Sequence, residues 1–127
     1  MPFGIESNRE EAERIRRDII AGREPRLDIV TLIAPDIAEN GAAVPVTIRV
    51  ACAMTEADYP VAVHLLAMEN PFPEICKHFF TPANGVAEVT MRTRMRTTAP
   101  LIALAIMSDG SIGVAEKLVN VTVGACT

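Results

Sequence analysis

The hydrophobic pattern of the sequence begins with a helical period and then changes to a strand period for the rest of the chain. Near the amino terminus, three apolar residues recur at the spacing of one helix face: Ala12, Ile15 and Ile19. Ser7 with Glu10 matches a capping box, and Gly22 supplies a stop. The pattern therefore predicts one N-terminal helix.

From residue 27 onward, apolar residues alternate with polar ones or form short runs, which is typical of β-strands. The clearest case is 44–52, where Thr47 and Arg49 share one face and the other face is apolar: Val44, Val46, Ile48, Val50 and Cys52. This alternation predicts a half-buried strand. Together with six further runs it makes seven predicted strands: 27–34, 44–52, 61–68, 75–81, 86–95, 101–107 and 112–123.

Turn motifs separate these runs. Three of them predict tight hairpins: Glu39-Asn40-Gly41, Asn84-Gly85 and Ser108-Asp109-Gly110-Ser111. Asn70-Pro71-Phe72-Pro73 predicts an irregular turn, because neither proline can donate a hydrogen bond to a strand. Short strands, tight turns and a single helix favour a two-sheet sandwich over a barrel.

The predicted fold class is all-β, namely a seven-stranded immunoglobulin-like antiparallel β-sandwich with one N-terminal α-helix. A length of 127 residues suits one such domain. We expect an N-terminal helical segment at 1–26, the sandwich at 27–123 and a flexible C-terminal arm at 124–127.

Composition limits the partners of this domain. The chain has no tryptophan, one tyrosine and four phenylalanines, and its net charge is −4. Nucleic-acid binding is therefore not expected, because it requires a concentrated basic face. The one basic cluster is Arg92, Arg94 and Arg96, whose spacing places them on one side of a strand. A solvated outer face is the favoured interpretation, and a patch for an anion or an acidic partner is the alternative.

The sequence also bears on membranes and compartments. No stretch reaches the roughly 18 apolar residues that a membrane helix requires, so a soluble domain is expected. The first residues, Met1 to Glu6, lack a basic region followed by an apolar one. Either the protein is cytosolic or the sequence is a mature form without its export signal.

Three cysteines are an odd number, so at least one has no partner within the chain. Cys126 is the candidate, because it follows an apolar strand and the small residues Gly124 and Ala125. We expect its thiol to project into solvent, where it is reactive or forms a disulfide-linked homodimer. Cys52 lies on the apolar face of its strand and is interpreted as a small buried hydrophobic residue.

Other candidate chemistry is weak. Cys76 and His78 share one strand face, and with His64, the only other histidine, they make a metal site a third possibility. The signal is weak, because two ligands lack a third at recognisable spacing. No nucleophile–base arrangement, phosphate loop or carboxylate pair follows from spacing. The sequence therefore predicts no metal, no cofactor and no enzyme activity.

Several stretches, in this order, resemble the SoxY family, the sulfur-carrier subunits of the bacterial thiosulfate-oxidising Sox system. They lie between residues 27 and 126: Ile33-Ala34-Pro35-Asp36-Ile37-Ala38-Glu39-Asn40-Gly41-Ala42, Val44-Pro45-Val46, Ala67-Met68-Glu69-Asn70-Pro71, His78-Phe79-Phe80-Thr81-Pro82-Ala83-Asn84-Gly85 and Met107-Ser108-Asp109-Gly110-Ser111. The resemblance implies an immunoglobulin-like sandwich that pairs with a SoxZ-like subunit as a heterodimer and meets other Sox enzymes transiently. It also implies a periplasmic location, and cargo held covalently on Cys126.

The tail departs from the family pattern Gly-Gly-Cys-Gly-Gly. Ala125 replaces a glycine, and Thr127 stands where two glycines are expected, so the sequence ends one residue early. Residues with a Cβ narrow the backbone conformations of the carrier arm. A nearer terminal carboxylate disfavours the nucleophilic thiolate. The tail is then that of a natural variant, a paralogue with other partners or an altered carrier.

Two hypotheses follow from the residues and the resemblance. The first is a sulfur carrier that holds thiosulfate-oxidation intermediates on Cys126, with Gly124, Ala125 and Thr127 forming the arm. The alternative is an immunoglobulin-like interaction module whose degenerate tail carries no cargo.

Overall fold

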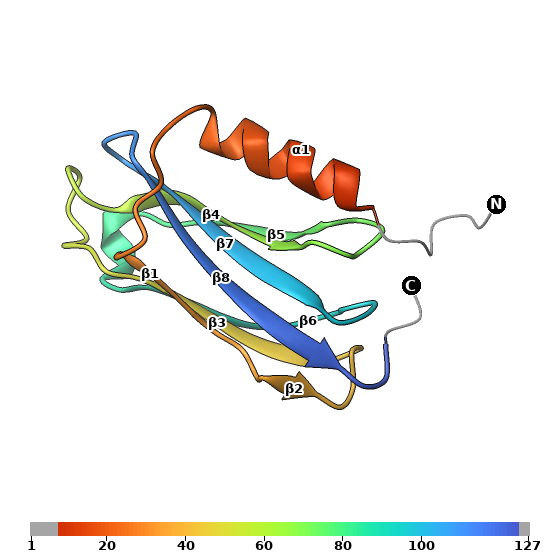
Figure 1. Ribbon diagram of the computed structural model, residues 1–127. Coiled ribbons are helices and arrows are strands. Elements are labelled where there is room, and N and C mark those ends of the chain that lie inside the picture. Colours follow the sequence, from red (N-terminus) through yellow and green to blue (C-terminus); the bar gives the residue numbers. More distant parts are fainter. Residues whose placement is uncertain (1–7, 125–127) are drawn as a thin grey trace.

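The computed structural model describes residues 8–124, which contain one α-helix, eight strands and a short 3-10 helix at Pro82–Asn84 (Figure 1). The α-helix precedes the strands along the chain. Their bounds are α1 Arg9–Ile20, β1 Val30–Ile33, β2 Ile37–Ala38, β3 Val44–Val50, β4 Pro60–Ala67, β5 Glu74–Phe79, β6 Ala87–Thr93, β7 Ala99–Met107 and β8 Ile112–Val121.

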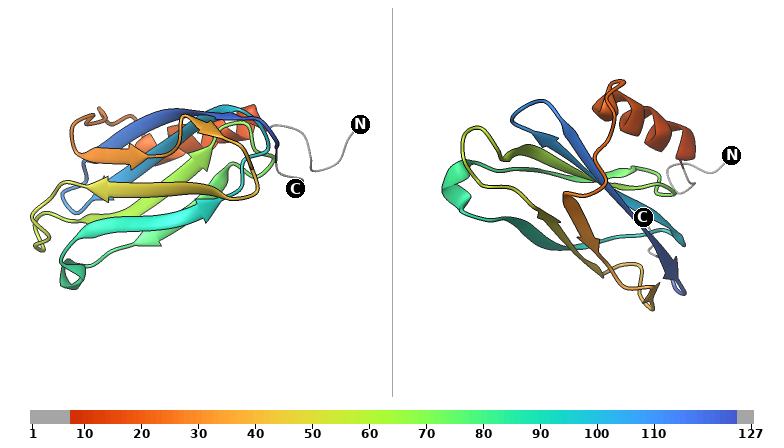
Figure 2. Two further views of the ribbon diagram at one scale, coloured as in Figure 1. Left: turned by 90° about the horizontal axis from the view of Figure 1, so that it is seen from below. Right: turned by 60° about the vertical axis from the view of Figure 1, so that its left-hand side comes forward.

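The strands form two sheets, which lie as separate layers (Figures 1 and 2). One has three strands in the order β1-β3-β6, and the other has five in the order β2-β8-β7-β4-β5. A mainly β fold with a single N-terminal helix was predicted, and this much is confirmed for residues 8–124. The immunoglobulin-like assignment stays a prediction.

The predicted number of seven strands is wrong, because the described residues contain eight. The additional strand is β2, whose Ile37 and Ala38 pair in parallel with Asn120 and Val121 of β8. The predicted sandwich was also wholly antiparallel, and this one parallel pair contradicts that. Two residues are too short to show a period of alternation, so the sequence pattern could not indicate the strand.

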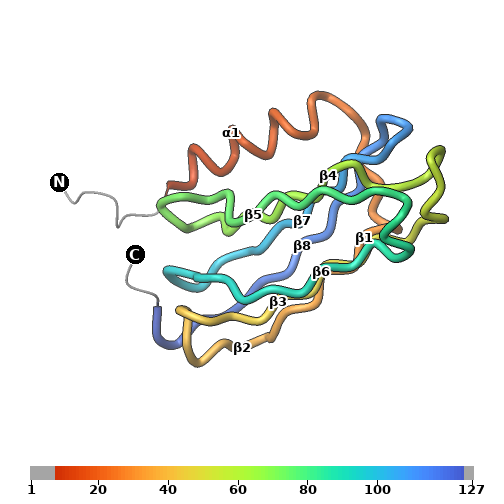
Figure 3. The backbone as a smooth tube through the Cα atoms, turned by 180° about the vertical axis from the view of Figure 1, so that it is seen from behind, coloured from red at the N-terminus to blue at the C-terminus, as the bar shows by residue number. Residues whose placement is uncertain are grey.

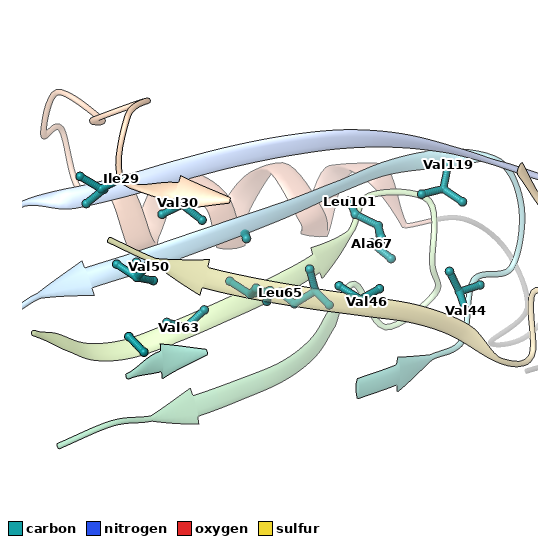
Figure 4. Close-up of a cluster of buried hydrophobic side chains, with 14 of the residues drawn as sticks. Ile29, Val30, Val44, Val46, Val50, Val63, Leu65, Ala67, Leu101 and Val119 are labelled. Atoms are coloured by element: carbon teal, nitrogen blue, oxygen red, sulfur yellow. The ribbon is translucent and has the colours of Figure 1, made fainter. Parts of the chain in front are cut away.

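The main core lies between the two sheets. Along β3, Val44, Val46, Ile48 and Val50 are buried while Pro45 and Arg49 are exposed, which confirms the predicted alternation. Buried side chains of the five-stranded sheet face them. Figure 4 shows several of these side chains, among them Val63, Leu65, Leu101 and Val119. Burial of this aliphatic surface is the main driving force for joining the sheets.

A second, smaller core lies between the five-stranded sheet and α1, which covers the outer face of that sheet (Figure 1). Ala12 is fully buried there, against the sheet residues Leu66, Met68, Ile102 and Leu104. Strands β4 and β7 are therefore buried on both faces. This explains why their sequences are continuous apolar runs rather than alternating ones.

The ends of α1 differ slightly from the prediction. Asn8 is the N-cap, and its side chain accepts a hydrogen bond from the Glu11 N–H at 3.3 Å. Ser7, the predicted cap, lies outside the described residues. At the other end Ala21 takes the left-handed conformation, with φ 51°, immediately before the predicted stop at Gly22.

One predicted hairpin is confirmed and two are wrong. The turn at 108–111 joins β7 to β8, and Gly110 has φ 87° there. By contrast, Asn84-Gly85 joins β5 to β6 and Glu39-Asn40-Gly41 joins β2 to β3, and each of these pairs of strands lies in different sheets. Turn residues set the local backbone, but they do not determine which sheet the next strand enters. The predicted irregular turn at 70–73 is confirmed between β4 and β5.

Within residues 8–124, no helix has the length and apolar character needed to cross a bilayer.

Candidate functional site

The predicted site is the arm at 124–127, and the described chain reaches its first residue. Ala125, Cys126 and Thr127 lie outside the described residues. Before them, backbone hydrogen bonds hold the chain to the β2–β3 connection. Thr122 N–H donates to Ala38 O at 3.0 Å, and Gly41 N–H donates to Val123 O at 2.7 Å. The base of the arm is thus fixed as far as Val123.

Gly124 lies directly against the backbone of Arg96. A Cβ at this position would overlap the Arg96 carbonyl oxygen and lie 3.1 Å from its carbonyl carbon. Gly124 does not have a positive φ, so its backbone conformation alone does not require glycine. Close approach to another backbone segment explains the residue, whereas the sequence suggested only a flexible stem.

We expect Gly124→Ala to lower the free energy of unfolding by about 1–3 kcal/mol, because the new Cβ must displace either the arm or Arg96. Gly124→Ser should give a similar loss, since both variants add a Cβ. Urea denaturation measures the change. Ala43→Ser serves as the control, because Ala43 is exposed at the same end of the sandwich. If Gly124→Ala is as stable as this control, the contact does not constrain the arm.

Asn70 holds the segment that carries this contact. Its buried side-chain amide donates to Arg94 O at 2.8 Å, and its side-chain oxygen accepts from Arg96 N–H at 2.9 Å. Asn70 lies between β4 and β5, so one side chain ties the five-stranded sheet to the segment after β6. The sequence showed Asn70 only as part of a turn, and no spacing indicated its distant partners.

Only one of the three arginines of the predicted cluster lies in a strand. Strand β6 ends at Thr93, so Arg92 belongs to the strand while Arg94 and Arg96 follow it. Arg92 and Arg94 are exposed, as the favoured interpretation of a solvated face requires. They also line a cleft, so the alternative of an anion-binding patch stays open.

Cys52 and Cys76 are both half-buried and neither forms a disulfide. The Cys52 thiol lies 3.5 Å from the Met54 sulfur, and the Cys76 thiol lies 3.4 Å from the Met91 sulfur. Burial raises the pKa of each thiol above its ordinary value. Both are therefore poorer nucleophiles at neutral pH than an exposed cysteine, and Cys52 packs against the core as expected.

The three residues considered for a metal do not come together. Cys76 pairs with Leu65 and His78 with Val63 across β4 and β5, so their side chains share the face of those core residues. His64 points to the opposite face, where its Nδ1 lies 2.9 Å from Glu74 Oε1. Over residues 8–124, no group of three or more His, Cys, Asp or Glu side chains is placed to hold a metal ion.

Comparison with known proteins gives a family and several structural relatives. The model of the family "Sulfur oxidation protein SoxY" matches residues 16–126. No curated protein matches the chain. Among solved structures, the sulfur carrier protein SoxY from Chlorobium limicola f thiosulfatophilum is 23% identical, with a TM-score of 0.71 over 91% of this chain and 100% of that chain.

Superoxide reductases are similar in fold as well. The superoxide reductase (neelaredoxin) from Ignicoccus hospitalis is 17% identical, with a TM-score of 0.64 over 73% of this chain and 80% of that chain. A putative superoxide reductase from Thermotoga maritima is 13% identical, with a TM-score of 0.60 over 76% and 87% of the two chains. At these identities the likeness concerns the fold alone.

Proposed function

The chain belongs to the SoxY family of sulfur oxidation proteins, and from this premise we propose that it is a sulfur carrier whose cargo is bound covalently to Cys126. The observation that carries the proposal is the extent of the family match, which runs to residue 126 and so includes this cysteine. The chain itself is proposed to catalyse nothing. It holds intermediates of thiosulfate oxidation while partner enzymes attach, oxidise and release them.

The other cysteines support the choice of Cys126. Cys52 and Cys76 are half-buried, and burial raises the pKa of both thiols, so neither suits a cargo that partner enzymes must reach. The arm at 124–127 begins after β8 ends at Val121, with only Thr122 and Val123 between them. The contact between Gly124 and Arg96 supports a defined starting point for the arm.

Loading follows from thiol chemistry. The Cys126 thiolate forms a sulfur–sulfur bond with the outer sulfur of thiosulfate, and the product is a protein-bound thiosulfonate. This bond formation releases two electrons, which pass to an electron-accepting partner enzyme. The carrier therefore needs a nucleophilic thiolate and an arm that enters the partner's site, but no acid–base residues of its own.

The proposed partners follow the family. They are a SoxZ-like subunit in a heterodimer and further Sox enzymes in transient contact, in the periplasm. Open sheet edges and exposed apolar side chains, such as Phe72 and Phe79, are compatible with such association. Two copies joined by a Cys126 disulfide would be a side product that competes with loading.

Retention of labelled sulfur tests the carrier role. The reduced chain is incubated with the pathway enzymes and with thiosulfate labelled at its outer sulfur, and is then desalted. We expect about one label per chain, released by dithiothreitol because the bond is a disulfide-type linkage. A chain alkylated beforehand is the control. If the untreated chain retains no more label than the control, the interaction-module alternative is favoured.

A further inference from the structure

A cleft with a volume of about 320 Å³ lies beside the base of the arm. On one side it is lined by the β4–β5 connection and the start of β5, including Asn70, Phe72 and Glu74. On the other side it is lined by Arg92, Thr93 and Arg94. Strands β5 and β6 are edge strands of their sheets, and both lie toward the viewer in Figure 3. The cleft therefore opens where the two sheets are not bridged by any strand.

The charges around the cleft are unbalanced. Neither Arg92 nor Arg94 forms an ion pair with a carboxylate among the described residues, whereas Arg9, Arg14 and Arg49 each do. The acid that lines the cleft is Glu74, whose Oε1 lies 2.9 Å from His64 Nδ1 instead. Two arginines thus line the cleft together with one carboxylate that already has a partner.

The backbone of β6 adds a donor. Opposite residues of an antiparallel pair alternately exchange two backbone hydrogen bonds and exchange none. Arg92 lies opposite Pro45 of β3, and because proline has no N–H, these two residues cannot exchange both bonds. The N–H and C=O of Arg92 consequently face away from β3, toward the open edge. Asn70 confirms that direction, because it binds Arg94 O and Arg96 N–H, which follow on the same edge.

We propose that this cleft binds a tetrahedral sulfur oxyanion through the guanidinium groups of Arg92 and Arg94 and the Arg92 N–H. Arginine forks bind the oxygens of tetrahedral anions in pairs, and residues two apart along a strand lie about 7 Å from each other, so both forks can reach one anion. Charge and donors select a tetrahedral oxyanion. That the oxyanion contains sulfur, as thiosulfate or the sulfonate end of the cargo, rests on the proposed function.

The place of the cleft suits such cargo. Arg96 lies two residues from Arg94 and contacts Gly124, and Cys126 follows Gly124 by two residues. Two residues of extended chain span about 7 Å. The span available between Gly124 and Cys126 is therefore similar to the span between Arg96 and Arg94, and this length is enough for an anion on Cys126 to meet the arginines. An occupied cleft would hold the anionic end of the cargo against the sandwich between visits to partner enzymes.

Binding is measured by NMR titration of the full chain carrying Cys126→Ser, so that no covalent step contributes. Thiosulfate, sulfate and phosphate are added at constant ionic strength. We expect saturable shifts of the Asn70, Arg92 and Thr93 amides with the sulfur oxyanions. Arg92→Gln with Arg94→Gln should weaken binding at least tenfold, because charge-assisted bonds supply most of the affinity. Thr93→Val should leave binding unchanged, because the Thr93 side chain is buried on the face of β6 opposite Arg92.

The control pair is Arg17→Gln with Arg26→Gln, which removes the same charge from exposed positions outside the cleft. Retained binding in this control supports the proposal. Equal affinity in the cleft and control variants overturns it, and so does phosphate binding more tightly than thiosulfate. Because the titrated chain lacks the Cys126 thiol, the result is independent of cargo loading, and either proposal can fail alone.

Discussion

Replacement of Cys126 by serine is expected to abolish the contribution of this chain to thiosulfate oxidation in a reconstituted pathway. A serine hydroxyl is not ionised at neutral pH and cannot form the sulfur–sulfur bond that holds the cargo. We expect the rate to fall to that measured without the chain. Thiosulfate consumption by the purified enzymes, with the variant in place of the original chain, is the measurement.

The other two cysteines provide matched controls for that variant. Cys52→Ser and Cys76→Ser each remove a half-buried thiol of raised pKa, so we expect both to support turnover close to the original rate. Full activity of Cys126→Ser would contradict the account. Loss of activity in a control that still folds would show that the thiol in question takes part.

Leu65→Ala is expected to destabilise the fold by about 3 kcal/mol. Leu65 is fully buried between the sheets, so truncation removes apolar contacts and leaves a cavity (Figure 4). Urea denaturation followed by circular dichroism gives the free energy of unfolding. A loss of this size is a large fraction of the total stability of a small domain.

Leu118→Ala is the matched control, because Leu118 is 54% exposed on β8 and loses few contacts on truncation. We expect it to change the free energy of unfolding by less than about 0.5 kcal/mol. Similar losses in the two variants would mean that the described packing between the sheets is not what stabilises the domain.

Local features of the fold were predictable from the sequence because they depend on neighbouring residues. Alternation along 44–50 indicated both the strand and its buried face. The turn at 108–111 was predicted correctly because its strands lie next to each other in one sheet. The pairing of sheets was not predictable at 39–41 or 84–85, since the same turn residues there lead into a different sheet.

The surroundings of the arm depend on contacts between distant residues, and the sequence could not indicate them. Asn70 bonds to Arg94 and Arg96, more than twenty residues away. Gly124 is required by the Arg96 carbonyl, although the sequence suggested only freedom of the backbone. The separation of His64 from Cys76 became clear only once the register of β4 and β5 placed them on opposite faces.

Cys126 was predicted as the attachment site from its position near the end of the sequence and from the family resemblance, and it lies outside the described residues. The structure narrows the choice by what it shows of the other thiols, both of which are half-buried. Ala125 and Thr127 differ from the glycines of the family tail, so the carrier role has to be tested on this chain itself.

Mass spectrometry of the tail peptide tests the central claim most directly. The reduced chain is exposed to thiosulfate and the purified pathway enzymes, digested without reducing agent and analysed for modified cysteines. The account predicts a sulfur or sulfonate adduct on Cys126, absent when thiosulfate is omitted, and unmodified Cys52 and Cys76. An unmodified Cys126, in a sample confirmed as reduced beforehand and with active enzymes, would contradict it.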